Sequence, residues 1–320
     1  MGCNGNEMHI EASSEKYPRD LAGYGGAPPN PKWPGGARIA MQFVLNYEEG
    51  GERCVLHGDR ESESFLSEIL CPPFVATRHM TMESVYEYGA RVGVWRVLDL
   101  FRERRVPLTL FAVATAMRRH PAPVERALAD GHEICSHGWR WIDYHGVSED
   151  AERADMQKAV ETHAQICGAR PLGWYTGRTS ENTRRLAAEE GGFLYDADDY
   201  SDDLPFWSRM TDSPHLVVPY TLDANDMRFS APHGFCTGGQ FYEYLRDSFD
   251  ALYREGETAP KMMSVGLHCR IVGRPARLEG LRQFLDYALK RDRVWFARRL
   301  DIARHWRERF PPPVAEKKSE

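Results

Sequence analysis

Short apolar runs alternate with helical patterns along most of this chain. The first run, 39–45, has the length and composition of a buried strand, and helical patterns separate it from the runs that follow. Strands that alternate with helices form a parallel sheet with the helices packed outside it. Seven or eight such units fit one α/β domain, and we expect a distorted (β/α) barrel of about seven parallel strands. The expected strands are 39–45, 106–113, 133–136, 172–176, 193–195, 216–220, 262–268 and 294–297.

These units also set the domain boundaries. Residues 39–310 form a single barrel domain in this interpretation, preceded by an N-terminal arm and wrapping loop over 1–38 and followed by a flexible tail over 311–320. The Pro- and Gly-rich part of the arm carries Tyr24 and Trp33, aromatic residues that favour burial. We therefore expect this part to wrap around the domain in an ordered way.

Composition and charge exclude several classes of function. The chain has 320 residues, of which 42% are hydrophobic and 28% charged, and its net charge is −6. It has no long basic block, so nucleic acid is not an expected partner. No window approaches the roughly 18 apolar residues of a membrane span, and the N-terminus lacks the apolar core of a signal peptide. The seven cysteines include no Cys-x-x-Cys pair, which favours reduced thiols and a cytoplasmic location.

Ionisable side chains stand where four of the expected strands end. Glu48 and Glu49 follow the first strand, His137 follows the third, Arg178 lies just beyond the fourth, and His268 ends the seventh. In (β/α) barrels the reactive groups come from the C-terminal ends of the strands, which meet at one face. We therefore expect these side chains to form one site.

Each of these residues also has a simpler interpretation. Glu-Glu pairs are common in solvated loops, and a single His is more often structural than catalytic. Their coincidence at strand ends favours a site in which adjacent Glu48 and Glu49 point in opposite directions, one into the pocket and one sideways. Glu48 is then the candidate general base, while His137 and His268 supply a general acid and an orienting or oxyanion-stabilising group.

A zinc site built from these residues would be incomplete. Hydrolytic zinc usually takes a carboxylate and two His, but no second His stands near His137. Trp141 occupies the position four residues further on, His132 precedes the strand, and His145 lies eight residues beyond. We therefore expect neither a bound metal nor another cofactor.

Flat side chains and a guanidinium complete the expected pocket. Trp139, Trp141 and Trp174 could line it, although core packing is the commoner fate of Trp and only one or two are expected there. Arg178 is a candidate clamp for a carbonyl, a ureide or a nascent carboxylate. We assign substrate binding to Trp141, Trp174, Arg178 and the sideways Glu49.

The motifs resemble those of the polysaccharide deacetylase (NodB-type) superfamily. Its first motif, Thr-Phe-Asp-Asp-Gly, corresponds to Asn-Tyr-Glu-Glu-Gly at 46–50. Its second motif, Gly-His-Glu-Ile-x-x-His, corresponds to 131–137, and its late Leu-His pair to 267–268. The resemblance runs from about residue 17 to residue 306 and implies the NodB-type deacetylase fold.

Longer stretches are similar to the metal-independent allantoinases of urate catabolism, a branch of that superfamily. They comprise 17–21, 44–52, 173–178 and 225–229, and the last adds Asn225 to the substrate-binding candidates. The similarity implies hydrolytic opening of the five-membered ring of (S)-allantoin to allantoate. It also implies a small-molecule substrate and a homo-oligomer, with a tetramer favoured.

The resemblance also implies a role for each matching residue. Glu48 matches the deacetylase base, Glu49 an aspartate that ligates the metal, His137 the first His ligand and His268 the general-acid His. Trp141 stands in place of the second His ligand. The Arg of the third deacetylase motif is replaced by Tyr175, so that Arg178 is expected to take over its charge.

We expect Glu48 to take a proton from water, which attacks the ring carbonyl. His137, with Arg178, then stabilises the oxyanion, and His268 protonates the leaving nitrogen. Three alternatives remain open at this point. They are a zinc-dependent carbohydrate N-deacetylase, a hydrolase of another cyclic imide or ureide, and a binding protein that has kept the barrel without the chemistry.

Overall fold

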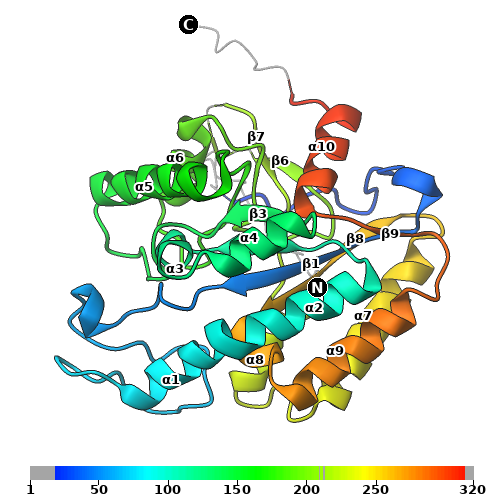
Figure 1. The fold of residues 1–320 in the computed structure, drawn as a ribbon. Coiled ribbons are helices and arrows are strands. Elements are labelled where there is room, and N and C mark those ends of the chain that lie inside the picture. Colours follow the sequence, from blue (N-terminus) through cyan, green and yellow to red (C-terminus); the bar gives the residue numbers. More distant parts are fainter. Residues whose placement is uncertain (1–18, 209, 212, 314–320) are drawn as a thin grey trace, which may run out of the picture.

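The fold is a curved, mostly parallel β-sheet with helices packed outside it (Figure 1). A computed structural model describes residues 19–208, 210–211 and 213–313. The strand order is β6-β7-β5-β4-β3-β2-β1-β8, and β9 pairs with the start of β1. The strands are β1 (Ile39–Tyr47), β2 (Thr109–Ala112), β3 (Glu133–Ser136), β4 (Gly173–Trp174), β5 (Tyr195–Asp196), β6 (Phe206–Ser208), β7 (His215–Val217), β8 (Lys261–His268) and β9 (Val294–Phe296).

The predicted α/β class with a largely parallel sheet is confirmed, but two features differ. Within the described residues the sheet is a half-barrel. Strands β6 and β8 lie at its two ends and do not pair with each other. In addition, β6 runs antiparallel to β7, which the sequence pattern did not predict. A short antiparallel strand carries no signal that distinguishes it from a parallel one.

The helices follow the strands largely as the pattern predicts. In α5, Ser148 and Gly168 occupy the expected terminal positions, although the Ser148 side chain makes no capping hydrogen bond. The sequence did not predict α1, nor the π-helical turn Gly89–Gly93 that joins it to α2. The helices are α1 (Met80–Tyr88), α2 (Val94–Arg104), α3 (Ala114–Arg119), α4 (Ala122–Ala129), α5 (Glu149–Cys167), α6 (Thr183–Glu190), α7 (Gly238–Glu255), α8 (Cys269–Val272), α9 (Pro275–Ala288) and α10 (Arg299–Arg309).

Strand β1 is the centre of the core, and its register positions the strand ends. All nine of its residues are buried, as expected for a strand covered on both faces. Asn46 of β1 pairs with Phe111 of β2 on one side and with His268 of β8 on the other. Since β2 in turn pairs with β3 up to Ser136, the residues that follow β1, β3 and β8 reach the same edge of the sheet.

The described part of the N-terminal arm packs against the sheet domain. The hydroxyl of Tyr24 donates to the Pro205 carbonyl oxygen at 2.6 Å, and the indole Nε1 of Trp33 donates to the Lys261 carbonyl oxygen at 3.0 Å. Trp33 is fully buried. The rest of the predicted arm, 1–18, and the tail from 314 onward lie outside the described residues.

Among the described residues, no helix has both the length and the apolar character needed to cross a bilayer.

Candidate functional site

Three side chains from three strand ends meet in a buried cluster. Glu48 Oε1 lies 3.4 Å from His137 Nε2 and 3.5 Å from His268 Nε2. All three side chains are almost completely buried. Neither ring nitrogen of His137 makes a well-aligned hydrogen bond within the described part of the chain, so both are available to a bound molecule or water. The structure thus brings together the three residues that the sequence predicted to be catalytic.

The charges around Glu48 keep its carboxyl group ionised. Burial alone would raise the pKa of this group, but the positive charges of Arg270 and His268 outweigh burial and hold the pKa well below its usual value. Burial lowers the pKa of His137, so that its imidazole is neutral at pH 7. The cluster therefore places a carboxylate beside a neutral imidazole.

His268 is paired with a buried aspartate, Asp226, which sequence analysis did not select. The His268 Nδ1 lies 2.6 Å from Asp226 Oδ1, while Asp226 Oδ2 accepts hydrogen bonds from the backbone N–H groups of His268 and Val272. Burial tends to lower the pKa of His268, but the negative charges of Glu48 and Asp226 raise it above the ordinary value. His268 is therefore suited to carry a proton on Nε2 and to act as a general acid.

Arg270, in α8, is the guanidinium that compensates Glu48. Its side chain is fully buried, and its Nη1 donates to Glu48 Oε2 at 2.6 Å. The same nitrogen lies 3.6 Å from Glu49 Oε1. Arg270 of α8, and not the predicted Arg178, therefore supplies the positive charge beside Glu48 in this structure.

Arg178 instead contacts aromatic rings and a carboxylate away from Glu48. Its guanidinium carbon lies 3.9 Å from the centroid of Trp141 and 4.9 Å from that of Phe65. Both of its terminal nitrogens lie 3.4 Å from Glu63 Oε2. Arg178 also lines a cavity that Glu48, His137 and His268 border, where it can reach a bound molecule.

Glu49 lies behind the cluster, outside that cavity. Its Oε2 accepts a hydrogen bond from the Glu48 backbone N–H at 3.1 Å, and its Oε1 has no hydrogen-bond partner among the described residues. Burial raises the pKa of its carboxyl group to about 7; Arg270 opposes this shift and Glu48 adds to it. Glu49 does not line the cavity, and its contacts are with the Glu48 backbone and Arg270.

Gly89 makes room for the Glu49 side chain. A Cβ atom at Gly89 would lie 2.2 Å from Glu49 Oε1. We expect Gly89→Ala to lower the free energy of unfolding by about 1–3 kcal/mol, because the buried carboxylate would have to shift. Urea unfolding followed by fluorescence measures this change. Gly26→Ala is the matched control, since a Cβ there meets nothing within 4 Å. Equal stability of the two variants would contradict this packing.

A small cavity opens onto the cluster of Glu48, His137 and His268. Its volume is about 220 Å³, which is below the roughly 300–1,000 Å³ typical of ligand pockets. It therefore suits a small, flat molecule. The residues that line it are Asn46, Glu48, Phe65, Leu66, His137, Trp141, Tyr175, Gly177, Arg178, Tyr200, Tyr220, Leu222, Asn225, Met227 and His268.

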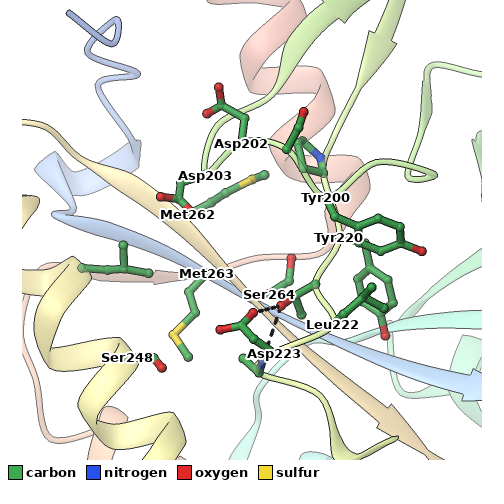
Figure 2. A pocket seen from close by; sticks show the side chains of 15 residues that line it. Tyr200, Asp202, Asp203, Tyr220, Leu222, Asp223, Ser248, Met262, Met263 and Ser264 are labelled. Atoms are coloured by element: carbon green, nitrogen blue, oxygen red, sulfur yellow. Dashed lines mark hydrogen bonds between the residues drawn. The ribbon is translucent and has the colours of Figure 1, made fainter. Parts of the chain in front are cut away.

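A larger cavity of about 380 Å³ is shown in Figure 2. Tyr200, Tyr220 and Leu222 line both cavities. The larger cavity is also bordered by Asp202 and Asp223, but none of the three clustered residues lines it. We therefore place the candidate active site in the smaller cavity, where the acid–base groups are.

The remaining predicted site residues divide into two groups. Trp141 and Asn225 line the cavity, although the Asn225 amide is already hydrogen-bonded to Thr221 and Met227 in its own turn. Trp174 does not line it and packs against Phe193 in a separate hydrophobic cluster. The structure therefore does not bring Trp174 to the cavity with the other predicted residues.

The residues at this site do not fit a divalent metal ion. Arg270 Nη1 already lies against both carboxylates of the Glu48–Glu49 pair, and Trp141 stands in place of a second His ligand. No group of three or more His, Cys, Asp or Glu side chains within the described ranges has an arrangement that could hold a metal. Tight zinc binding generally needs at least three protein ligands, so we derive no step through a metal.

Comparisons with known proteins place this chain in a family. The model of the polysaccharide deacetylase family matches residues 76–193. A Schizosaccharomyces pombe protein that bears the name polysaccharide deacetylase is 42% identical over 314 residues, which cover 92% of this chain and 98% of that protein. The chain therefore belongs to the polysaccharide deacetylase family.

Two solved structures are closely similar to the whole chain. One, from Pseudomonas aeruginosa PAO1, also bears the name polysaccharide deacetylase; it is 62% identical, with a TM-score of 0.91, and the match covers 93% of this chain and 100% of that one. The other bears the name Puue allantoinase; it is 60% identical, with a TM-score of 0.92, and the match covers 93% of this chain and 99% of that one. The names of these relatives differ in the reaction they imply.

Proposed function

We propose that this hydrolase opens the five-membered ring of (S)-allantoin to give allantoate, without a metal ion. The observation that carries the proposal is the position of Glu48, an ionised carboxylate between two imidazoles at the base of a small cavity. The cavity holds the groups that amide hydrolysis needs, but its volume suits a small ring better than a sugar chain. The 60% identity to a structure that bears the name allantoinase supports this choice of substrate.

The proposed reaction uses the three clustered residues. Glu48 accepts a proton from a water molecule, whose oxygen attacks a carbonyl carbon of the ring. His137, a neutral imidazole whose Nε2 lies 3.4 Å from Glu48 Oε1, stabilises the oxyanion through its N–H group. The ring C–N bond then breaks as His268 gives its Nε2 proton to the leaving nitrogen. The new carboxylic acid passes the remaining water proton to the neutral His268, which leaves the product as a carboxylate, and Glu48 returns its proton to solvent on product release.

Substrate contacts beyond the cluster come from the cavity wall. The ring of Trp141 and the guanidinium of Arg178 lie against each other, so a flat ureide can meet both an apolar face and a hydrogen-bond donor. Asn225 also lines the cavity, held by hydrogen bonds within its own turn.

The competing function is a metal-dependent N-deacetylase of amino sugars, which the names of two relatives favour. The experiment that separates the two offers the purified protein allantoin and, separately, an N-acetylated chito-oligosaccharide. Allantoate as the product supports the proposal, whereas release of acetate without turnover of allantoin overturns it. A related cyclic imide, such as hydantoin, tests how far the ureido group contributes to recognition.

A further inference from the structure

The side chain of Arg270 lies between the two carboxylates that follow β1. A single nitrogen, Nη1, is 2.6 Å from Glu48 Oε2 and 3.6 Å from Glu49 Oε1. The side chains of all three residues are at most 1% exposed. One buried cation therefore serves two adjacent buried carboxyl groups, as a metal ion does between paired carboxylates.

The surroundings hold this guanidinium in place on several sides. Its carbon lies 4.3 Å from the ring centroid of Tyr86 and 5.1 Å from that of Trp141. Its Nε donates to the Leu66 carbonyl oxygen at 3.2 Å. Its Nη2 has no hydrogen-bond partner among the described residues. Aromatic faces attract a guanidinium most strongly when water is excluded, as it is here.

We propose that Arg270 is a built-in cation that takes the place of a divalent metal at the Glu48–Glu49 pair, with Trp141 closing the space beside it. This inference deepens the metal-free reaction proposed above. Its test measures metal binding rather than turnover, so the inference on Arg270 and the proposed hydrolysis of allantoin can fail separately.

The chemical consequences follow from the difference between a guanidinium and a metal. A guanidinium supplies positive charge and directed N–H groups, but it has no open coordination position at which to activate water. Arg270 can therefore keep Glu48 ionised, while activation of the water is left to Glu48 and the imidazoles. In this scheme Arg270 is a positioning residue, because it does not line the cavity that would hold substrate.

The experiment asks whether removing this cation creates a zinc site. Zinc is titrated calorimetrically into the wild type, Trp141→His, Arg270→Met and the double variant R270M/W141H, and metal content is measured after dialysis. Arg299→Met is the matched control, because Arg299 is also fully buried but bonds Gln42, Ser264 and backbone carbonyls instead of a carboxylate. It tests whether loss of any buried arginine produces zinc binding.

We expect the double variant to bind one zinc ion per chain at least 100-fold more tightly than the wild type. The W141H and R299M variants should gain no such site, because Arg270 remains in both. R270K/W141H, which keeps a positive charge, should also bind zinc weakly. A merely structural role of Arg270 would not make R270K/W141H bind zinc more weakly than R270M/W141H does.

Two results would overturn the inference. One is stoichiometric, tight zinc binding by the wild type or by W141H, in which Arg270 is intact. The other is a folded R270M/W141H that binds zinc no better than the wild type. R270Q/W141H, with a polar side chain, gives the same comparison if the methionine variant fails to fold. If neither folds, the result for W141H alone decides: tight binding contradicts the inference and its absence supports it.

Discussion

Glu48→Gln should reduce the kcat for allantoin by roughly 10²–10⁴-fold, the usual range for loss of a general base. The substitution keeps the size of the side chain but removes the charge that lies 3.4–3.5 Å from both imidazoles. It also leaves the buried Arg270 without its main partner, and breaking a buried ion pair costs on the order of 3–5 kcal/mol. Steady-state kinetics and thermal unfolding must therefore be measured on the same preparation.

Glu133→Gln is the matched control for this effect. Glu133 is also a buried glutamate, but it lies at the start of β3 and bonds Thr109, Tyr195 and the Leu300 backbone N–H. We expect this variant to lose stability while it retains turnover. Near-normal turnover by folded Glu48→Gln would show that Glu48 is not the base.

Asp226→Asn should lower kcat by a similar factor, on the order of 10²–10⁴-fold, through its effect on His268. Asp226 uses both carboxylate oxygens, accepting from His268 Nδ1 and from two backbone N–H groups. An asparagine presents only one oxygen, and its NH₂ group cannot stabilise a protonated imidazole. His268 would then be neutral and a much weaker acid.

The pH dependence distinguishes this role from a merely structural one. Asp226 is one of the charges that raise the pKa of His268, so its removal lowers that pKa. The general acid must be protonated, and activity therefore falls as pH rises through its pKa. We expect the alkaline limb of kcat against pH to move to lower pH in Asp226→Asn. An unchanged limb with a uniformly lower rate would contradict the assignment of His268 as the acid.

Sequence analysis could predict the catalytic cluster because it depends on the sheet alone. Glu48, His137 and His268 each follow a strand of a parallel sheet, and the carboxyl ends of such strands share one edge. The registers of β1 with β2 and β8 then bring them within hydrogen-bonding range. The prediction that these three side chains lie close together did not require the conformation of any loop.

The partners of the cluster could not be predicted in the same way. Asp226 comes from the 3₁₀ turn Asp226–Ser230 and Arg270 from the short helix α8, so their positions depend on how loops pack over the sheet edge. Sequence analysis selected Arg178 instead of Arg270 because Arg178 lies just after a predicted strand. Its guanidinium packs on Trp141 at the cavity wall rather than on Glu48.

Alternation along the strands explains the two misplaced substrate residues. Adjacent side chains at the two strand ends differ in direction: Tyr175 and Glu48 line the cavity, whereas their neighbours Trp174 and Glu49 do not. Sequence analysis recognised this alternation for the Glu pair but still gave Glu49 a ligand contact. Whether the sheet closes depends on edge pairing, which no local sequence pattern records.

The most direct test of a metal-free ring hydrolase is turnover of (S)-allantoin by protein stripped with a strong chelator and assayed in its presence. Metal content is measured on the same sample, and the product is identified by mass spectrometry, with Glu48→Gln as the negative control. We predict allantoate at a rate equal to that of untreated protein, with no gain on adding zinc. Loss of activity on chelation that stoichiometric zinc restores would contradict the account.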